Sequence, residues 1–315
     1  MKLLLALIVL IFSSQNSQVV SLAIGTAINT TPASVPCPAN STSFNNVCYR
    51  AVNTTATWTN AAIDCISQGG NLASVSSDSV NNFIVNLAGQ KFGTPTRFWI
   101  GGSSSISSDG SWVWIDGNNM NYTNWAIGHP RNVATYDSIQ MHGPSGKWYD
   151  ESSQFFAPYV CEVPPVGTTN QCYDNWYYLA TTNKCYRVIT KTNTFLNQRS
   201  ACYSFDGDLV SIHSTGENFF VGALATKAFN NTYKELFIGA KYTSSKWSWV
   251  DETPYNWWPN KWNLTNLGSY NYYGLIETGT TTNKFLWDYD DTSSTYPAIC
   301  DSDPSFLKKE KKIVN

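Results

Sequence analysis

Charged residues are scarce in this chain, because Asp, Glu, Lys and Arg together make up only 13% of its 315 residues. The formal net charge is −2, and 15% of the residues are aromatic. This composition is the opposite of that of a disordered or nucleic-acid-binding protein. A surface for DNA, RNA or an anionic membrane is therefore not expected.

Long apolar runs are also scarce. The one near the N-terminus extends from Leu3 to Phe12, follows the single positive residue Lys2 and precedes a polar segment. It is too short to span a bilayer and is typical of a cleaved secretory signal. We expect a signal at residues 1–17, with cleavage near Ser17 or near Ala23, then a Thr/Pro-rich leader at 18–36. The chain is expected to be secreted, without a membrane span.

Catalytic motifs are missing as well. The three histidines, His129, His142 and His213, show no His-x-x-x-His spacing, and there is no Cys-x-x-Cys pair that would indicate zinc. The chain has no Gly-x-Ser-x-Gly, P-loop or dinucleotide fingerprint. Its cysteines all fit a structural framework, so no free thiol remains as a nucleophile. We expect that the protein is not an enzyme.

The chain does contain a dense aromatic stretch from Phe98 to Trp125. Large apolar side chains alternate there and are interrupted by glycine and Asp-Gly, which predicts short strands joined by tight turns. Its four tryptophans need a hydrophobic core. A weaker copy of this pattern, Phe237 to Asp251, indicates that the same unit occurs twice.

The eight cysteines repeat in the same way. Cys37, Cys48, Cys65 and Cys161 are followed at a nearly constant offset by Cys172, Cys185, Cys202 and Cys300. An even number of cysteines in an exported chain suggests disulfides. The order favours Cys37–Cys48 and Cys172–Cys185 as closures of terminal hairpins. It favours Cys65–Cys161 and Cys202–Cys300 as links from a helix to the last strand, although other connectivities stay open.

Each unit is expected to contain two helices. Apolar residues spaced from Trp58 to Ile66 predict an amphipathic helix that ends before Gly69-Gly70. Phe195 to Tyr203 is its counterpart in the second unit. A second helix follows each time, with an apolar face formed by Val80, Phe83, Ile84 and Leu87 in the first unit and a capping-box start at Ser214–Glu217 in the other.

These features together resemble the C-type lectin-like domain twice over, in residues 37–163 (repeat one) and 172–302 (repeat two), with a linker at 164–171 and a basic tail at 303–315. The resemblance is carried by the cysteines, the first helix and three ordered motifs: Asn71–Val75, Trp99-Ile100-Gly101 and Trp112-Val113-Trp114. The tandem form looks like secreted two-domain members from nematodes. The resemblance implies an α+β fold in which each repeat has two helices, two small antiparallel sheets and a long loop region that carries the ligand site in lectins.

In sugar-binding members of this family a Glu-Pro-Asn and a Trp-Asn-Asp motif hold one calcium ion, which needs six to eight oxygen ligands. Repeat one has His129-Pro130-Arg131 and Trp148-Tyr149-Asp150 at these places. An imidazole and a cation replace a carboxylate and an amide, and Tyr149 replaces the amide of the second motif. Three of the four side-chain ligands are thus lost, so repeat one is expected to bind calcium poorly. The family's proline is typically cis, although a trans proline in a turn stays open here.

Repeat two retains Asp288 in Trp287-Asp288-Tyr289, so calcium is possible there but doubtful. Its first motif is either Trp258-Pro259-Asn260 or is displaced towards Trp262. Aromatic rings stack on sugars and also form cores. Trp257, Trp258 and Trp262 therefore remain candidates for either role.

We therefore expect a protein that binds an extracellular glycan or glycoprotein, largely without calcium, in a setting such as innate immunity. A protein-interaction or matrix module, and a calcium lectin acting through repeat two alone, are the alternatives. The sequons that could carry glycans are Asn29, Asn40, Asn53, Asn121, Asn230 and Asn263.

Overall fold

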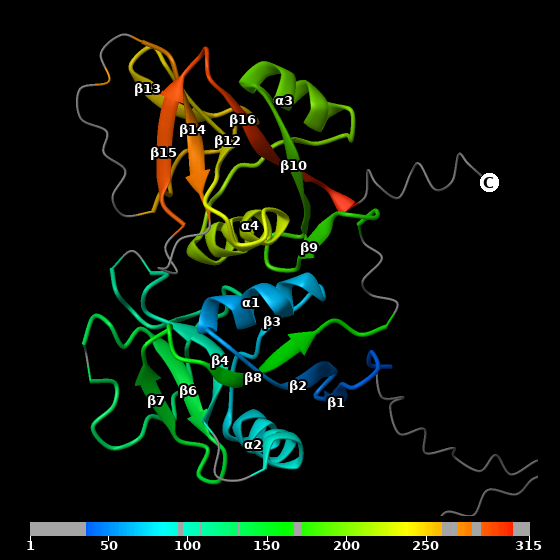
Figure 1. The fold of residues 1–315 in the computed structure, drawn as a ribbon, viewed down its shortest axis with the longest axis vertical. Helices are drawn as coiled ribbons and strands as arrows, with labels where there is room; N and C mark the ends of the chain where they lie inside the picture. Colours follow the sequence, from blue (N-terminus) through cyan, green and yellow to red (C-terminus); the bar gives the residue numbers. More distant parts are fainter. Residues whose placement is uncertain are drawn as a thin grey trace, which may run out of the picture. The chain divides into compact units, whose positions relative to one another are not determined.

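The computed structural model describes residues 36–93, 97–107, 109–131, 133–166, 172–259, 267, 270–278 and 285–304 (Figure 1). The expected signal, nearly all of the leader, linker residues 167–171 and tail residues 305–315 lie outside the described residues. The predictions for Asn29, Asn260, Trp262 and Asn263 also lie outside them. No helix in the described part of the chain is long and apolar enough to cross a membrane.

Within the described ranges, each repeat contributes two helices and eight strands. Repeat one contains β1 (Thr42–Phe44), β2 (Val47–Ala56), α1 (Trp58–Ser67), β3 (Asn71–Leu72), α2 (Asp78–Phe92), β4 (Arg97–Ser103), β5 (Val113–Trp114), β6 (Ser138–His142), β7 (Trp148–Glu151) and β8 (Ala157–Val163). Repeat two contains β9 (Tyr177–Leu179), β10 (Lys184–Thr194), α3 (Phe195–Tyr203), β11 (Asp208–Leu209), α4 (Thr215–Ala228), β12 (Glu235–Thr243), β13 (Lys246–Trp249), β14 (Tyr272–Glu277), β15 (Trp287–Asp291) and β16 (Thr295–Ser302).

The strands of each repeat form a single sheet. Its main path is β1-β2-β8-β4-β6-β7 in repeat one and β9-β10-β16-β12-β14-β15 in repeat two. Neighbouring strands are antiparallel, except that β4 runs parallel to β8 at Trp99 and Tyr159, and β12 runs parallel to β16 at Phe237 and Ala298. The α+β class is confirmed. The two small sheets expected in each repeat are joined into one by this parallel contact.

The predicted helices begin and end close to where the sequence pattern placed them. The side chain of Ser77 accepts a hydrogen bond from the backbone N–H of Val80 at the start of α2. At the start of α4, the Ser214 hydroxyl accepts from the N–H of Glu217, as a capping box requires. The Glu217 carboxylate, however, accepts from the N–H of His213, one residue earlier than in the usual motif.

All four expected disulfides are present. Cys37–Cys48 and Cys172–Cys185 close the terminal hairpins. Cys65–Cys161 joins α1 to β8, and Cys202–Cys300 joins α3 to β16. The longer pair of bridges restricts the unfolded chain most, by roughly 4–5 kcal/mol each in the loop-entropy model.

The tryptophans of the stretch from Phe98 to Trp125 supply the core of repeat one. Trp99 and Trp114 are buried, and the Trp114 ring meets Trp148 edge-on at 5.5 Å between centroids. Trp112 and Trp125 are half-buried and meet edge-on at 4.9 Å. The core therefore reaches the base of the long loop between β5 and β6.

Helix α4 is buried on nearly all sides, because eleven of its residues are buried. Part of this surface packs inside repeat two, where Gly222 lies so close to the Phe285 ring that a Cβ would meet it at 2.0 Å. The ring of Phe219 meets Trp58 of α1 at 5.4 Å between centroids. These apolar residues of α1 and α4 belong to one hydrophobic cluster.

Candidate ligand-binding site

The long loop of repeat one, between β5 and β6, is fixed to β7 by backbone hydrogen bonds. The N–H of Ala126 donates to the carbonyl of Trp148 at 2.9 Å, and the N–H of Trp148 donates to Asn124 at 2.9 Å. The N–H of His129 then donates to the carbonyl of Ala126. The His129–Pro130 peptide is cis. These contacts bring the His129-Pro130-Arg131 segment over Asp150.

Asp150 has no exposed surface, and its carboxylate is held by that segment. The backbone N–H of Arg131 donates to Oδ2 at 2.9 Å, and its Nε donates to Oδ1 at 3.3 Å. The Nδ1 atom of His129 also hydrogen-bonds to Oδ1. Both carboxylate oxygens therefore already have protein partners. A calcium ion would have to displace these donors and would meet the positive charge of Arg131.

A layer of arginines and aromatic rings lies beside this carboxylate. The Arg97 guanidinium lies 3.8 Å from the centroid of the Tyr149 ring, and its Nη1 lies 2.8 Å from the Glu151 carboxylate. The Arg131 guanidinium lies 3.8 Å from the Tyr136 ring. Such stacking keeps a cation positioned while leaving it partly solvated. The structure thus brings together all five residues that the sequence analysis singled out in repeat one: His129, Pro130, Arg131, Tyr149 and Asp150.

The corresponding strand of repeat two is different. Trp287 pairs with Ile276 on β14, as Trp148 pairs with Met141 on β6, so Tyr289 stands in the place of Asp150. Asp288 is exposed. Repeat two therefore offers no carboxylate at the place that Asp150 occupies in repeat one.

Asp288 lies beside Glu235 and Glu277, with carboxylate oxygens of all three within 4.8 Å of one another. Burial, followed by the neighbouring charges of Asp288 and Glu235, raises the pKa of Glu277. In the described part of the chain this is the one group of carboxylates, cysteines or histidines close enough to share a metal ion. Exposed acidic residues also gather without a metal, so this group is a candidate and no more.

The aromatic candidates of repeat two lie in different environments. Trp257 is half-buried and meets the core residue Trp287 edge-on at 5.8 Å. Trp258 is 50% exposed and stacks with Tyr255 at 6.1 Å. A second group of rings forms a pocket of about 710 Å³ together with polar side chains, lined by Tyr270, Asn271, Tyr272, Tyr289, Asp290 and Asp291.

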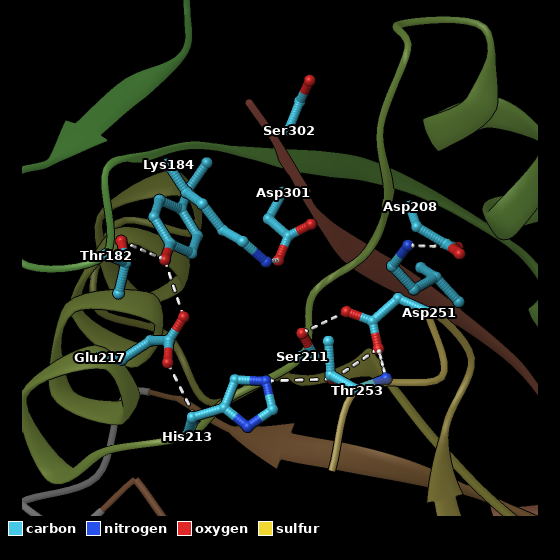
Figure 2. Close-up of polar contacts among 12 residues, drawn as sticks. Thr182, Lys184, Asp208, Ser211, His213, Glu217, Asp251, Thr253, Asp301 and Ser302 are labelled. Carbon is cyan, nitrogen blue, oxygen red and sulfur yellow. Dashed lines mark hydrogen bonds and ion pairs between the residues drawn. The ribbon is translucent and has the colours of Figure 1, made fainter. Parts of the chain in front are cut away.

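Sequence analysis missed a buried polar cluster in repeat two, shown in Figure 2. The Lys184 ammonium donates to the Asp301 carboxylate at 2.8 Å, and the Ser211 hydroxyl donates to Asp251 at 2.6 Å. Glu217 accepts from the hydroxyl of Tyr186 at 2.7 Å. Burial raises the pKa of Asp301 to about 7, and Lys184 opposes that rise. Lys184 therefore supplies a positive charge beside the carboxylates of Asp301, Glu217 and Asp251.

Repeat one contains the matching carboxylates without the lysine. The Ser74 hydroxyl donates to Asp116 at 2.6 Å, and its backbone N–H donates to Glu162 at 3.0 Å. Val47, directly before Cys48, stands where Lys184 stands before Cys185. The recurrence of serine and both acids at matching places in the two repeats was the signal that could have identified this cluster.

Glu162 should make the stability of repeat one depend on pH. Burial and the nearby Asp116 raise the pKa of Glu162 from 4.5 to about 8 in the folded chain. Above about pH 5 the unfolded chain has already lost this proton, whereas the folded chain keeps it until the pH approaches about 8, so stability falls as pH rises over this range. We expect Glu162→Gln to remove a slope of at most about 1.4 kcal/mol per pH unit. Urea unfolding of the variant and the parent over this range measures the difference.

The exposed Glu252 provides the control, because Glu252→Gln should leave the slope unchanged. An identical pH slope in Glu162→Gln and the parent chain would show that the folded state does not retain the Glu162 proton.

The comparisons with known proteins agree on one family. The family model for the lectin C-type domain matches residues 54–163 and 191–302. Lymphocyte antigen 75 of Homo sapiens is 29% identical over 228 residues, which cover 67% of this chain and 13% of that protein. C-type mannose receptor 2 of Homo sapiens is 28% identical over 206 residues, covering 61% of this chain and 13% of the receptor. The chain thus spans 13% of the length of each of these relatives.

Shorter proteins match less than half of this chain. The galactose-specific lectin nattectin of Thalassophryne nattereri is 35% identical over 141 residues, which cover 44% of this chain and 88% of nattectin. Among solved structures, the C-type lectin CEL-I of Cucumaria echinata is 30% identical with a TM-score of 0.38, covering 40% of this chain and 96% of CEL-I.

Proposed function

Because this chain belongs to the family of C-type lectin domains, we propose that it binds carbohydrate and that repeat one does so without calcium. The names of two relatives, a galactose-specific lectin and a mannose receptor, support hexoses as the class of ligand. The role is binding and not catalysis.

Asp150 is the main support for calcium independence. In a calcium-dependent site its carboxylate would be shared between the ion and neighbouring side chains. Here Arg131 and His129 take both oxygens, and Asp150 is fully buried beneath them. A guanidinium and an imidazole thus stand where the family's motif would supply two further oxygen ligands. Sugar hydroxyls must then be recognised by protein groups alone.

We also propose that the protein is secreted and meets its glycan or glycoprotein outside the cell, in innate immune recognition. The signal-like N-terminus and four disulfides support an oxidising, extracellular setting. Four of the six sequons, Asn40, Asn53, Asn121 and Asn230, are exposed and accessible to glycosylation.

Glycan binding by the full chain should survive removal of calcium. We expect it to retain neutral, hexose-terminated oligosaccharides on a glycan array equally in calcium and in EDTA, and free hexose should compete. Retention of a protein partner without any glycan binding would instead favour an interaction or matrix module.

A calcium lectin acting through repeat two is the second candidate, supported by the group of Glu235, Glu277 and Asp288. It requires that EDTA abolish binding and that calcium restore it. Asp288→Asn should then have the same effect as EDTA, whereas Asp303→Asn, at an exposed position outside this group, should have none. That pattern would overturn calcium independence.

A further inference from the structure

Repeat one has a second concave surface, beside the arginine and aromatic layer. It is a pocket of about 470 Å³ lined by Arg97, Gln140, Glu151, Phe155, Phe156 and Ala157, and we call it the Phe156 pocket. Its volume lies within the range of about 300–1,000 Å³ that is typical of small-molecule sites. This pocket is separate from the candidate site at His129-Pro130-Arg131. The two are linked by Glu151, which lines the pocket and forms an ion pair with Arg131.

Repeat two shows what occupies the equivalent place. Ala157 and Tyr296 correspond, because each comes directly before a proline in the last strand and pairs with the same irregular part of the long N-terminal strand. Glu151 and Asp290 correspond in the same way, since each is the third residue after the matching tryptophan. The Tyr296 hydroxyl donates to Asp290 at 2.7 Å.

The Tyr296 ring also packs edge-on against Phe237 at 5.1 Å. Repeat two thus fills this position with a six-membered ring whose hydroxyl reaches a carboxylate. In repeat one the side chain of Ala157 ends at Cβ and is 4% exposed, and Ala157 and Glu151 line the same pocket. The carboxylate that would receive such a hydroxyl is still there.

The walls of the pocket present complementary chemistry to a hydroxylated ring. Phe155 is 53% exposed and Phe156 is 71% exposed, so their ring faces are available to a ligand. Exposed large aromatic residues of this kind often mark a binding surface. On the other side, the Glu151 carboxylate is an acceptor, and the Arg97 guanidinium that pairs with it at 2.8 Å carries several donors. Because these two charges balance, the pocket favours a neutral ligand.

We propose that the Phe156 pocket binds a neutral pyranose residue of a glycan. One sugar hydroxyl donates to Glu151, as the Tyr296 hydroxyl donates to Asp290, and the C–H face of the sugar packs on Phe155 and Phe156. The inference rests on the carbohydrate-binding function proposed above and assigns it a place in repeat one. It also explains how a sugar can be held without a metal, since each contact comes from a protein side chain.

Two variants of the full chain test this assignment from opposite directions. Ala157→Tyr fills the pocket with the side chain that repeat two already uses, and Phe156→Ala removes an exposed ring without disturbing the core. Both should weaken binding to immobilised mannose-, galactose- and N-acetylglucosamine-terminated oligosaccharides, measured in EDTA, by about tenfold or more. Leu196→Ala, which shortens an apolar side chain that is 64% exposed on α3, should leave binding unchanged.

The outcomes distinguish a failure of the pocket assignment from a failure of the proposed carbohydrate-binding function. Glycan binding by the parent chain that is unaltered in both variants would overturn the pocket and leave the proposed function standing. No binding by the parent to any of these oligosaccharides would overturn both. If Ala157→Tyr fails to fold, as judged by circular dichroism, Phe156→Ala and Glu151→Gln decide. Ligand-observed NMR can also compare N-acetyltyrosinamide with the sugars. Binding of N-acetyltyrosinamide without binding of any sugar would overturn the pyranose assignment in favour of a phenol.

Discussion

Arg131→Ala is expected to destabilise repeat one by roughly 3 kcal/mol. The variant leaves the buried Asp150 carboxylate with the Arg131 backbone N–H and His129 as its remaining partners. The estimate is at the lower end of the range for breaking a buried ion pair, because the Arg131 side chain is 34% exposed. Urea unfolding at pH 7, followed by tryptophan fluorescence, measures the loss.

A second substitution separates the charge from the packing of the side chain. Asp150→Asn removes the buried charge, so Arg131→Ala should cost much less in that background than in the parent chain. Arg187→Ala in repeat two removes a guanidinium that lies over the Phe205 ring and provides a matched control. Equal losses with and without Asp150→Asn would show that Arg131 does not neutralise this carboxylate.

The same residues are expected to decide whether calcium can bind. His129→Glu together with Arg131→Asn replaces the imidazole and the cation by the oxygen ligands typical of the family, beside the unchanged Asp150. Because an ion that binds only the folded chain raises its stability, we expect the melting temperature of this double variant to rise with calcium. The parent chain should show no such rise from repeat one.

Lys184→Met is expected to cost repeat two roughly 3 kcal/mol at pH 8. The Lys184 ammonium pairs with Asp301 at 2.8 Å, and both side chains are largely buried. The pKa of Asp301 is already raised to about 7 by burial, and loss of the lysine would raise it further. A carboxyl group whose pKa is raised in the folded state makes the folded protein less stable as pH rises through that range. The loss in urea unfolding should therefore be greater at pH 8 than at pH 5.

The matched control is Lys191→Met, which removes an exposed lysine from the same strand β10. It should change stability little at either pH, as is usual for a surface position. Asp301→Asn should restore most of the stability lost in Lys184→Met. A loss that is the same at both pH values would argue against Lys184 as the counter-ion of Asp301.

Many elements of the fold could be predicted from local patterns. Helix α1 begins at Trp58, where the apolar spacing starts, and α3 spans the predicted residues from Phe195 to Tyr203. The disulfides were predictable because the cysteines recur in the same order in both repeats. The joining of the sheets was not predictable, because the parallel contact between Trp99 and Tyr159 links strands far apart in the chain.

The candidate site, too, was predictable from the sequence only in part. The sequence located His129, Arg131 and Asp150 by their distance from neighbouring motifs of the repeat, and it predicted that three of the four side-chain calcium ligands are lost. It could not show that the replacing side chains turn back onto the remaining acid, since that depends on the path of the loop over β7. Trp257 and Trp258 are adjacent in the sequence and of the same type. Only the structure showed that Trp257 is half-buried against the core and that Trp258 is exposed.

By itself, the sequence determined the two repeats, their helices, their cysteine framework and the loss of calcium-ligand chemistry in repeat one, because each depends on residue types at fixed spacing. Only the tertiary structure decided that Arg131 lies against Asp150, that Lys184 faces Asp301, and that Ala157 lines a pocket whereas the Tyr296 hydroxyl reaches Asp290. These depend on side-chain direction and on residues from separate strands and loops. Such contacts form only when the chain folds.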